Sequence, residues 1–250
     1  MRASSGPLIG CAGWSIPGRY ADLFGPGESM LARYATRFPV VEINSSFYRP
    51  HKPATYERWA ASVPPAFRFS VKIPRTISHD SALVGVGPLL DRFLDESSAL
   101  GTKLGGLLLQ LPPSLALDTR RASSFFRALR RRSEAPLACE PRHASWFTDA
   151  ADALLLRHGV SRLGADPARV PAAAQPGGAS TWRYWRWHGA PRMYYSDYDD
   201  AALDALAGQM RQARGPRWVI FDNTAHGFAV ANAARLQERL STRTARSDTE

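Results

Sequence analysis

The amino-acid sequence predicts an α/β fold, a TIM-like barrel of eight parallel strands. Eight strand-like segments alternate with about seven helical ones over 250 residues, which is the order of a closed parallel sheet wrapped by helices. No internal repeat of the solenoid kind is present. An open doubly wound sheet is the alternative, but the glycine-rich dinucleotide fingerprint is missing after the first strand. We expect one domain over residues 1–250, with its core at about 8–240 and a frayed polar tail at 241–250.

The predicted strands are short apolar runs that end in polar residues or turns. The run at 104–110 is almost continuously apolar, as expected for a strand that is buried on both faces. In the run that begins at Val40, apolar residues interleave with Glu42 and Asn44, so a period of two places both polar side chains on one face. The other strands are predicted at 8–13, 67–72, 137–140, 160–165, 181–188 and 218–222.

Helices are predicted from apolar positions at helical spacing and from their start signals. Ser29 is expected to cap the first helix, Pro53 to open the second, and Thr148 or Asp149 to cap the fifth. Residues 167–179 contain three prolines and two adjacent glycines, so the sixth helix is expected to be short or missing. The other helices are expected from 88, over 120–132, from 199 and from about 225 or 226.

Composition sets limits on the partners. The net charge is +10 with a pI of about 10.2, which suits nucleic acid, an anionic small molecule or an acidic surface. However, 29 of the 32 basic residues are Arg, a bias that makes the arginine excess poor evidence for nucleic acid. Two isolated cysteines form neither a zinc site nor a disulfide framework. No run approaches the 18 apolar residues that span a bilayer, so we expect a cytoplasmic protein without a membrane partner.

Polar residues gather at the carboxyl ends of the predicted strands, the face on which barrels of this type carry their active sites. A carboxylate such as Glu42 is costly to bury unless it is paired or used. It is therefore either part of a site or bound to a neighbouring Arg or Lys within the packed barrel. A lysine at a strand end needs a nearby anion, which for Lys72 is either Glu42 or a ligand. The residues placed there are Glu42, Asn44, Lys72, Gln110, Glu140, Arg142, Asp166, His188, Asp222 and Asn223.

Several of these positions have structural alternatives. Gln110 either faces the site or closes the barrel by bonding backbone groups, and His188 either transfers protons or is a satisfied core histidine. The start of the last helix either binds an anion or is simply capped by Thr224. The loop aromatics Trp14, Tyr48 and Trp146 either stack on a ligand or pack beneath the loops.

Seven ordered motifs then carry a family resemblance: GCAGWS, VEINSSFYR, FRFSVKIPRTISH, LGGLLLQLPPS, ACEPRHASW, RWHG and FDNTAHGFAVANA. From about Leu8 to about Leu240 the chain resembles the domain of unknown function 72 family, also called YecE-like. The resemblance implies a TIM-like barrel and no established reaction. Its recurrent positions add Ser45 and His143 to the residues above and include Tyr48 and Trp146. One departure is Pro141, between Glu140 and Arg142, which affects the placing of the arginine.

Three functions are compatible with these residues. The first is an enzyme (hydrolase, lyase or isomerase) acting on an anionic, phosphorylated or carboxylated small molecule. Glu42 or Glu140 would be its acid or base, with Lys72 and His188 in the catalytic set. The residues expected to bind substrate are Asn44, Ser45, Tyr48, Gln110, Arg142, His143, Trp146, Trp14, Asp222 and Asn223.

The second is a nucleic-acid binding or processing protein with an endonuclease-like barrel, and the third is a non-catalytic ligand sensor. The sequence contains no HExxH or CxxC spacing, so an obligate metal is unsupported, no required cofactor is evident and no metal ligands are assigned. A weak divalent ion could still be held by Glu42, Glu140, Asp166, His188 and Asp222. The oligomeric state does not follow from these patterns.

Overall fold

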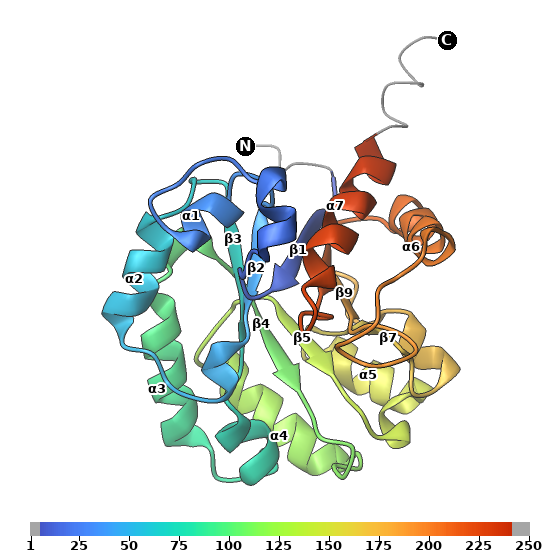
Figure 1. The fold of residues 1–250 in the computed structure, drawn as a ribbon. Coiled ribbons are helices and arrows are strands. Elements are labelled where there is room, and N and C mark those ends of the chain that lie inside the picture. Colours follow the sequence, from blue (N-terminus) through green and yellow to red (C-terminus); the bar gives the residue numbers. More distant parts are fainter. Residues whose placement is uncertain (1–5, 242–250) are drawn as a thin grey trace.

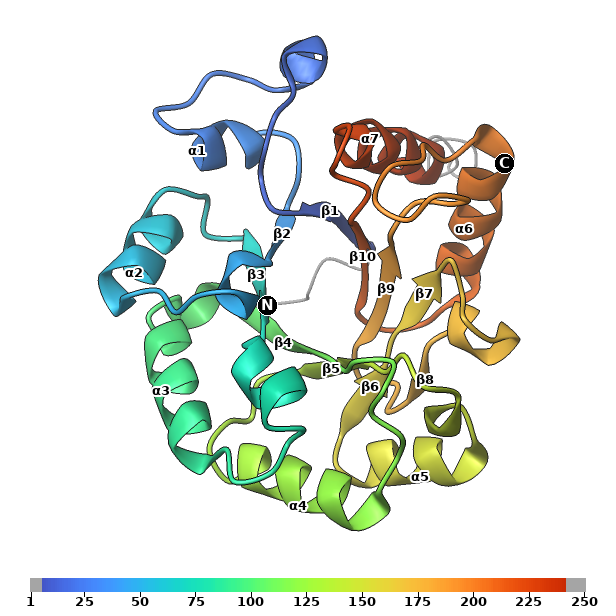
Figure 2. The same ribbon diagram turned by 60° about the horizontal axis from the view of Figure 1, so that its bottom comes forward.

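The computed structural model describes residues 6–241, which fold into a ring of strands with helices outside it (Figures 1 and 2). The sheet has ten strands in the order β7-β9-β10-β1-β2-β3-β4-β5-β6-β8. The predicted α/β barrel is confirmed. The strands are β1 (Leu8–Ala12), β2 (Val40–Ile43), β3 (Arg68–Lys72), β4 (Leu104–Gln110), β5 (Leu137–Glu140), β6 (Val160–Arg162), β7 (Gly164–Asp166), β8 (Gly177–Gly178), β9 (Arg183–Trp187) and β10 (Arg217–Phe221).

The strand predicted at 160–165 closes the ring by changing partners along its length. Its first part, β6, pairs in parallel with β5, and its second part, β7, pairs in parallel with β9. Only Leu163 separates the two parts. The segment after β7 holds a 3-10 turn at Pro171–Ala174 and the short β8, which pairs antiparallel to β6. The short or missing sixth helix is thereby confirmed, and β8 is an addition that the sequence did not predict.

Seven α-helices cover the outside of the described barrel (Figure 2). The Ser29 and Thr148 side chains cap their helices by accepting from the backbone N–H of Ala32 and Ala151, as expected. The last helix begins two residues later than His226, and residues 242–250 of the expected polar tail lie outside the described residues. The helices are α1 (Met30–Tyr34), α2 (Pro53–Ala61), α3 (Gly87–Ser98), α4 (Thr119–Arg130), α5 (Asp149–Arg157), α6 (Asp200–Gln212) and α7 (Phe228–Ser241).

The alternation of side chains along the strands produces two apolar cores. In β2, for example, Val41 and Ile43 face the helices and join the larger core, whereas Val40 faces the barrel interior. Glu42 shares the inward parity of Val40. The interior core consists of Val40, Leu108, Ala138, Leu163, Trp182, Tyr184, Trp218 and Ile220.

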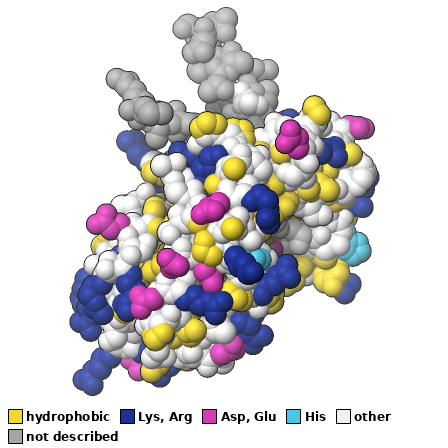
Figure 3. Space-filling view, turned by 90° about the vertical axis from the view of Figure 1, so that its left-hand side faces the viewer, with side chains coloured by type: hydrophobic (Ala, Val, Ile, Leu, Met, Phe, Trp, Pro, Cys, Tyr) yellow, Lys and Arg dark blue, Asp and Glu magenta, His cyan; other side chains and the backbone are white. Residues whose placement is uncertain are grey.

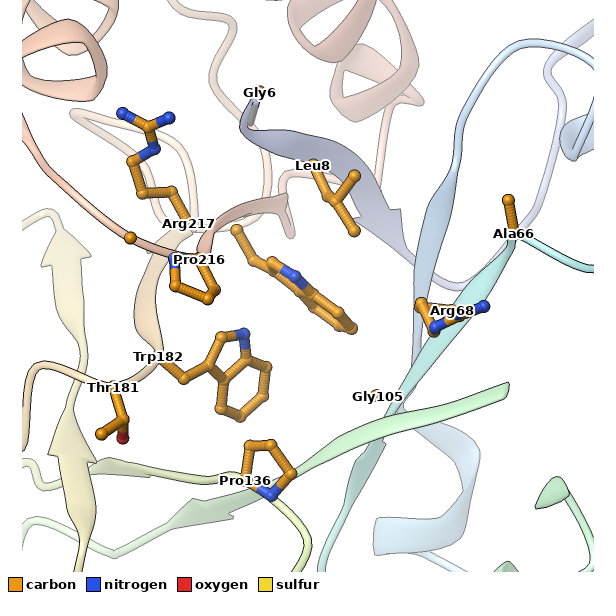
Figure 4. A pocket seen from close by; sticks show the side chains of 12 residues that line it. Gly6, Leu8, Ala66, Arg68, Gly105, Pro136, Thr181, Trp182, Pro216 and Arg217 are labelled. Carbon is orange, nitrogen blue, oxygen red and sulfur yellow. The ribbon is translucent and has the colours of Figure 1, made fainter. Parts of the chain in front are cut away.

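The amino ends of the strands surround a pocket of about 560 Å³ (Figure 4). Leu8 and Trp182 point into it, and Trp182 packs edge-on against Trp218 with 5.0 Å between ring centroids. Glycine is required beside these rings, because a Cβ at Gly105 would lie 2.3 Å from the Trp218 ring. In barrels this face usually serves stability, while the chemistry lies at the opposite end.

Candidate active site

Inward-facing residues at the carboxyl ends of the strands form one buried group of charges, which we call the mouth cluster. The parallel register brings these ends together: Gln110 of β4 lies beside Glu140 of β5, and Ile220 of β10 beside Arg186 of β9. Every member except Arg142 is at most 4% exposed. The mouth cluster consists of Glu42, Lys72, Glu140, Arg142, Arg186, His188 and Asp222.

Arg186 is the centre of the mouth cluster and is fully buried. Its guanidinium donates to both carboxylate oxygens of Glu42, with Nη2 2.7 Å from Oε1 and Nε 3.0 Å from Oε2. Nη1 lies 2.9 Å from Glu140 Oε2, and Nη2 lies 3.0 Å from Asp222 Oδ2. Burial disfavours the charge, but the three carboxylates outweigh it and raise the pKa of Arg186 above its ordinary value. Arg186 therefore stays charged and ties three strands together.

Glu42 is held on all sides and has no exposed surface. Besides the bonds from Arg186, its Oε2 accepts from the Tyr184 hydroxyl at 2.8 Å. This arrangement is the pairing with a basic residue that the sequence left open as the alternative to a catalytic role. Glu42 acts on the mouth cluster by fixing Arg186.

His188 connects two carboxylates. Its Nε2 lies 3.1 Å from Glu140 Oε1, and its Nδ1 lies 3.0 Å from Asp222 Oδ2. Burial opposes protonation, but Glu140 and Asp222 outweigh it and raise the pKa of His188. Both ring nitrogens can then donate, which only the protonated imidazole allows.

Glu140 accepts from three basic groups. Arg142 donates to its Oε1 from Nη2 at 2.8 Å and from Nε at 3.0 Å, in addition to the contacts from His188 and Arg186. Burial raises the pKa of Glu140, but Arg142, His188 and Arg186 outweigh burial and hold it well below its usual range. Pro141 has therefore not moved Arg142 away from the site. A cavity of about 20 Å³, room for about one water, is lined in part by Glu140, Arg142 and His188.

Lys72 differs from the rest of the mouth cluster. Within residues 6–241 its ammonium has neither a hydrogen-bond acceptor nor a carboxylate within salt-bridge distance, although its side chain is only 4% exposed. Its Nζ lies 4.1 Å from the centroid of the Phe47 ring, a cation–π contact. Burial, and then Arg186, lower the pKa of Lys72 to about 8. Because Glu42 is already bound by Arg186, the pairing between Lys72 and Glu42 that the sequence allowed does not occur.

Other residues expected at the site lie near the mouth but outside the network of the mouth cluster. The Gln110 side chain ends β4 and makes no hydrogen bond to another described residue. Asn44 follows β2, and its Oδ1 is buried without a hydrogen-bond partner among residues 6–241. Ser45 Oγ lies 2.8 Å from His51 Nε2. Tyr48 is 69% exposed, so its ring is open to solvent.

Four expected residues have structural roles instead. Trp146 is 1% exposed, and its Nε1 donates to Leu115 O at 3.0 Å. Asn223 is fully buried, and its Nδ2 donates to Ser196 O and to Asn232 Oδ1. Trp146 thus fills the structural alternative that the sequence left open, and Asn223 keeps a buried Oδ1 without a partner among the described residues. His143 caps the turn at Ala144–Trp146, and Trp14 packs against Trp59.

The sequence analysis did not predict Arg186, and it also did not predict two other residues near the mouth, Tyr194 and His79. Tyr194 has a φ of +70°, donates its N–H to His188 O, and places its ring 5.9 Å from the His188 ring. A left-handed backbone at a non-glycine residue is costly and is found mostly at functional positions. The second residue, His79, lies beside Lys72 and packs against the same Phe47 ring. Neither position stands at a strand end, so the sequence pattern that located the site could not reveal them.

Between residues 6 and 241, no three His, Cys, Asp or Glu side chains are placed to hold a metal ion. Asp166, named above as a possible ligand, accepts from the Tyr198 hydroxyl at 2.7 Å. In the same stretch no helix is both long and apolar enough to cross a membrane.

Comparison with known proteins gives the family. Residues 8–250 match the family model described as protein of unknown function DUF72. The chain belongs to this family. The DUF72 chain is 32% identical over 157 residues to the UPF0759 protein YecE of Escherichia coli (strain K12), covering 62% of this chain and 56% of that protein. The matched region thus spans little more than half the length of this curated relative.

Solved structures support the fold. A DUF72 family protein from Thermotoga maritima is 23% identical, with a TM-score of 0.79 and coverage of 94% of this chain and 99% of that one. A family 2 AP endonuclease from Brucella melitensis is 12% identical, with a TM-score of 0.51 and coverage of 91% and 96%. At these identities the likeness concerns the fold alone.

Proposed function

We propose that this DUF72 protein is an enzyme that uses acid–base chemistry on an anionic small molecule, phosphorylated or carboxylated, at the carboxyl ends of the barrel strands. The observation that carries the proposal is Lys72, a residue only 4% exposed at the mouth, whose ammonium has no acceptor among the described residues. Buried charges in proteins are normally paired. The carboxylates nearest to it are already bound by arginines and His188, so a ligand anion is the partner that the site lacks.

The paired carboxyl and imidazole groups suit proton transfer. Their surroundings separate the two pKa values, lowering that of Glu140 and raising that of His188, which favours an ionised carboxylate beside a protonated imidazole. Such a separation is how one site provides a base and an acid together. Both groups line the small cavity at the mouth. In our proposal Glu140 removes a proton from the substrate, His188 supplies one, and Lys72 holds the anion. Hydrolysis, elimination and isomerisation could all use this set.

A thermal-shift screen tests the anion part of the proposal. Phosphorylated sugars, carboxylates, nucleotides and short single-stranded oligonucleotides are titrated at low and moderate salt, since a specific ligand raises the melting temperature by mass action. Lys72→Met removes the buried ammonium, and Lys52→Met removes an exposed one from the loop after β2. A small anion should stabilise wild type and Lys52→Met but not Lys72→Met. Equal stabilisation of all three proteins would place the anion elsewhere.

Turnover of such a ligand distinguishes an enzyme from a non-catalytic sensor with the same pocket. Glu140→Gln should abolish turnover while ligand stabilisation persists, because the amide retains the shape of the side chain but accepts protons poorly. Melting temperature without ligand verifies that the variant is folded. Unchanged activity would remove Glu140 from the mechanism, and binding without turnover in wild type would favour the sensor.

Nucleic acid is the second candidate, favoured by the net charge of +10 and by the exposed Tyr48 at the mouth. On the face in Figure 3, however, acidic side chains are interspersed with the basic ones, and no continuous basic stripe crosses it. A nucleic-acid function predicts oligonucleotide binding that falls steeply with salt. If only oligonucleotides stabilise the protein, and salt removes the effect equally in wild type and Lys72→Met, the basic surface is the functional element.

A further inference from the structure

The loop after β3 places a histidine beside the unpaired lysine. Phe47 contacts both: Lys72 Nζ lies 4.1 Å from the centroid of its ring, and the His79 ring lies at 5.0 Å, nearly perpendicular at 82°. Phe47 itself is buried in the turn that follows β2. One aromatic ring therefore contacts both an ammonium and an imidazole, and the two groups are close enough that the charge of Lys72 acts on His79.

The His79 ring is held from one side only. Its Nδ1 lies 2.8 Å from the Oγ of Ser78, which is fully buried and within 3.3 Å of Pro74 O. Its Nε2 makes no hydrogen bond to any residue between 6 and 241. About half-buried and fixed through Nδ1, the ring has Nε2 left for a ligand.

Charges around His79 are mostly positive. They are Lys72 of β3, Arg75 and Asp80 of its own turn, and Arg142 of the loop after β5. Asp80 is itself paired with Arg75 at 3.2 Å. Burial, followed by Lys72 and Arg75, lowers the pKa of His79, so the imidazole is neutral at pH 7 in the free protein. An anion among these cations would reverse that balance.

The charge of the mouth cluster indicates which anion fits. With His188 protonated, as its raised pKa favours, the mouth cluster carries four positive charges, on Lys72, Arg142, Arg186 and His188, and three negative ones, on Glu42, Glu140 and Asp222. The sum is one positive charge, which a carboxylate neutralises. A phosphate monoester carries almost two negative charges at pH 7, and one more proton on the protein would complete the match.

We propose that Lys72 and His79 together form a subsite for a dianionic group such as a phosphate monoester, and that His79 takes up a proton when the dianion binds. This inference rests on the proposed function and narrows its substrate class from anions in general to phosphorylated compounds. The proton comes from solvent and is shared between the His79 Nε2–H and an oxygen of the bound dianion, so no other reactant is needed. Lys72, with a pKa of about 8, supplies a positive charge at pH 7 that does not depend on the ligand.

Imidazole NMR tests the inference with simple ions. Sulfate serves as a dianion that does not titrate near neutral pH, and acetate as the monoanion, each added at constant ionic strength made up with NaCl. The ring resonances of His79 are assigned with His79→Asn. Sulfate should raise the proton affinity of His79 at least tenfold, whereas acetate should leave it within about twofold. Lys72→Met should lose the sulfate effect, and Lys52→Met should keep it.

The resonances of His51 provide an internal control, because its pKa is also lowered, by burial and Arg49, but it does not share the Phe47 ring. Equal movement of His51 and His79 would show a general salt effect and overturn the inference. Binding of acetate and sulfate that depends on Lys72 but leaves His79 neutral would overturn the dianion subsite and preserve the proposed function. If neither ion responds to Lys72→Met, both proposals fail.

Discussion

Replacing Lys72 by methionine should stabilise the free protein, which is unusual for a residue assigned to a functional site. The variant exchanges a buried ammonium for an apolar chain of similar length. Lys72 is 4% exposed, and burial lowers its pKa from the ordinary 10.5 to about 8. A pKa difference of about 2.5 corresponds to roughly 3 kcal/mol at 1.36 kcal/mol for each pKa unit. That is the approximate cost of keeping the unpaired ammonium charged in the folded state.

The cost of keeping Lys72 charged in the folded protein should decrease as the pH rises above 8. Between pH 8 and 10.5 the unfolded chain keeps the Lys72 proton while the folded protein loses it, so the unfolded state binds more protons and stability rises with pH. Below pH 8 both states are protonated and the full cost applies. The free energy of unfolding of Lys72→Met should therefore exceed that of wild type by about 3 kcal/mol at pH 7. At pH 10 this difference should be smaller by roughly 2 kcal/mol.

Urea unfolding of wild type, Lys72→Met and Lys52→Met at the two pH values measures this difference. Other groups that titrate near pH 10 are common to the three proteins and cancel in the comparison. Lys52 is exposed, so its variant should follow wild type at both pH values. A Lys72→Met protein less stable than wild type at pH 7, with no change at pH 10, would show that Lys72 has a partner in the free protein. The case for a missing anion would then be refuted.

Three further predictions concern the barrel itself. Arg186→Met should lower the free energy of unfolding in urea by about 3–5 kcal/mol, because it leaves buried carboxylates without their counter-charge. A loss below 1 kcal/mol would contradict the place of Arg186 at the centre of the mouth cluster. NMR titration should find a pKa of His188 above the ordinary value for histidine. The contribution of His188 to stability should be present at low pH and be lost as the pH rises through this raised pKa. A His188 pKa below 6 would refute the arrangement with two carboxylates. Gly105→Ala should lower the free energy of unfolding by about 1–3 kcal/mol, because the new Cβ meets the Trp218 ring. Gly208→Ala, in α6 and with open space around it, should raise the free energy of unfolding by about 0.5–1 kcal/mol. Equal effects of the two substitutions would contradict the close packing around Gly105.

The strand ends were predictable because their polar residues interrupt apolar runs. Lys72 and Glu140 stand at the last positions of β3 and β5, where the sequence placed them. What periodicity cannot supply is which of these charges pair across the barrel. Glu42 is matched with Arg186 from a strand 144 residues away, and no local pattern encodes that distance. Trp146 shows the converse, since a loop aromatic that suits a ligand is equally suited to filling the core.

Arg186 was overlooked although parity could have revealed it. His188 was placed at the end of its strand, and a period of two puts Arg186 on the same inward face. In the other strands the residue two positions before the polar end is uncharged, such as Val40 before Glu42 or Ala138 before Glu140. An arginine at this depth in a barrel needs several carboxylates above it, so its presence predicts that those carboxylates converge.

That convergence also bears on how the mouth cluster could serve the proposed acid–base chemistry. Three carboxylates from different strands meet one guanidinium, so each carboxylate fixes the others through Arg186 and the mouth is organised before a ligand arrives. A hydrophobic centre of similar size could be as stable, but it would leave Glu140 and His188 without the field that separates their protonation states. Within the mouth cluster Lys72 alone makes no hydrogen bond to a described residue, so the predicted stability cost at Lys72 is the measurement that bears most directly on the proposed anion site. A protein under selection for stability alone would have methionine or leucine in that position.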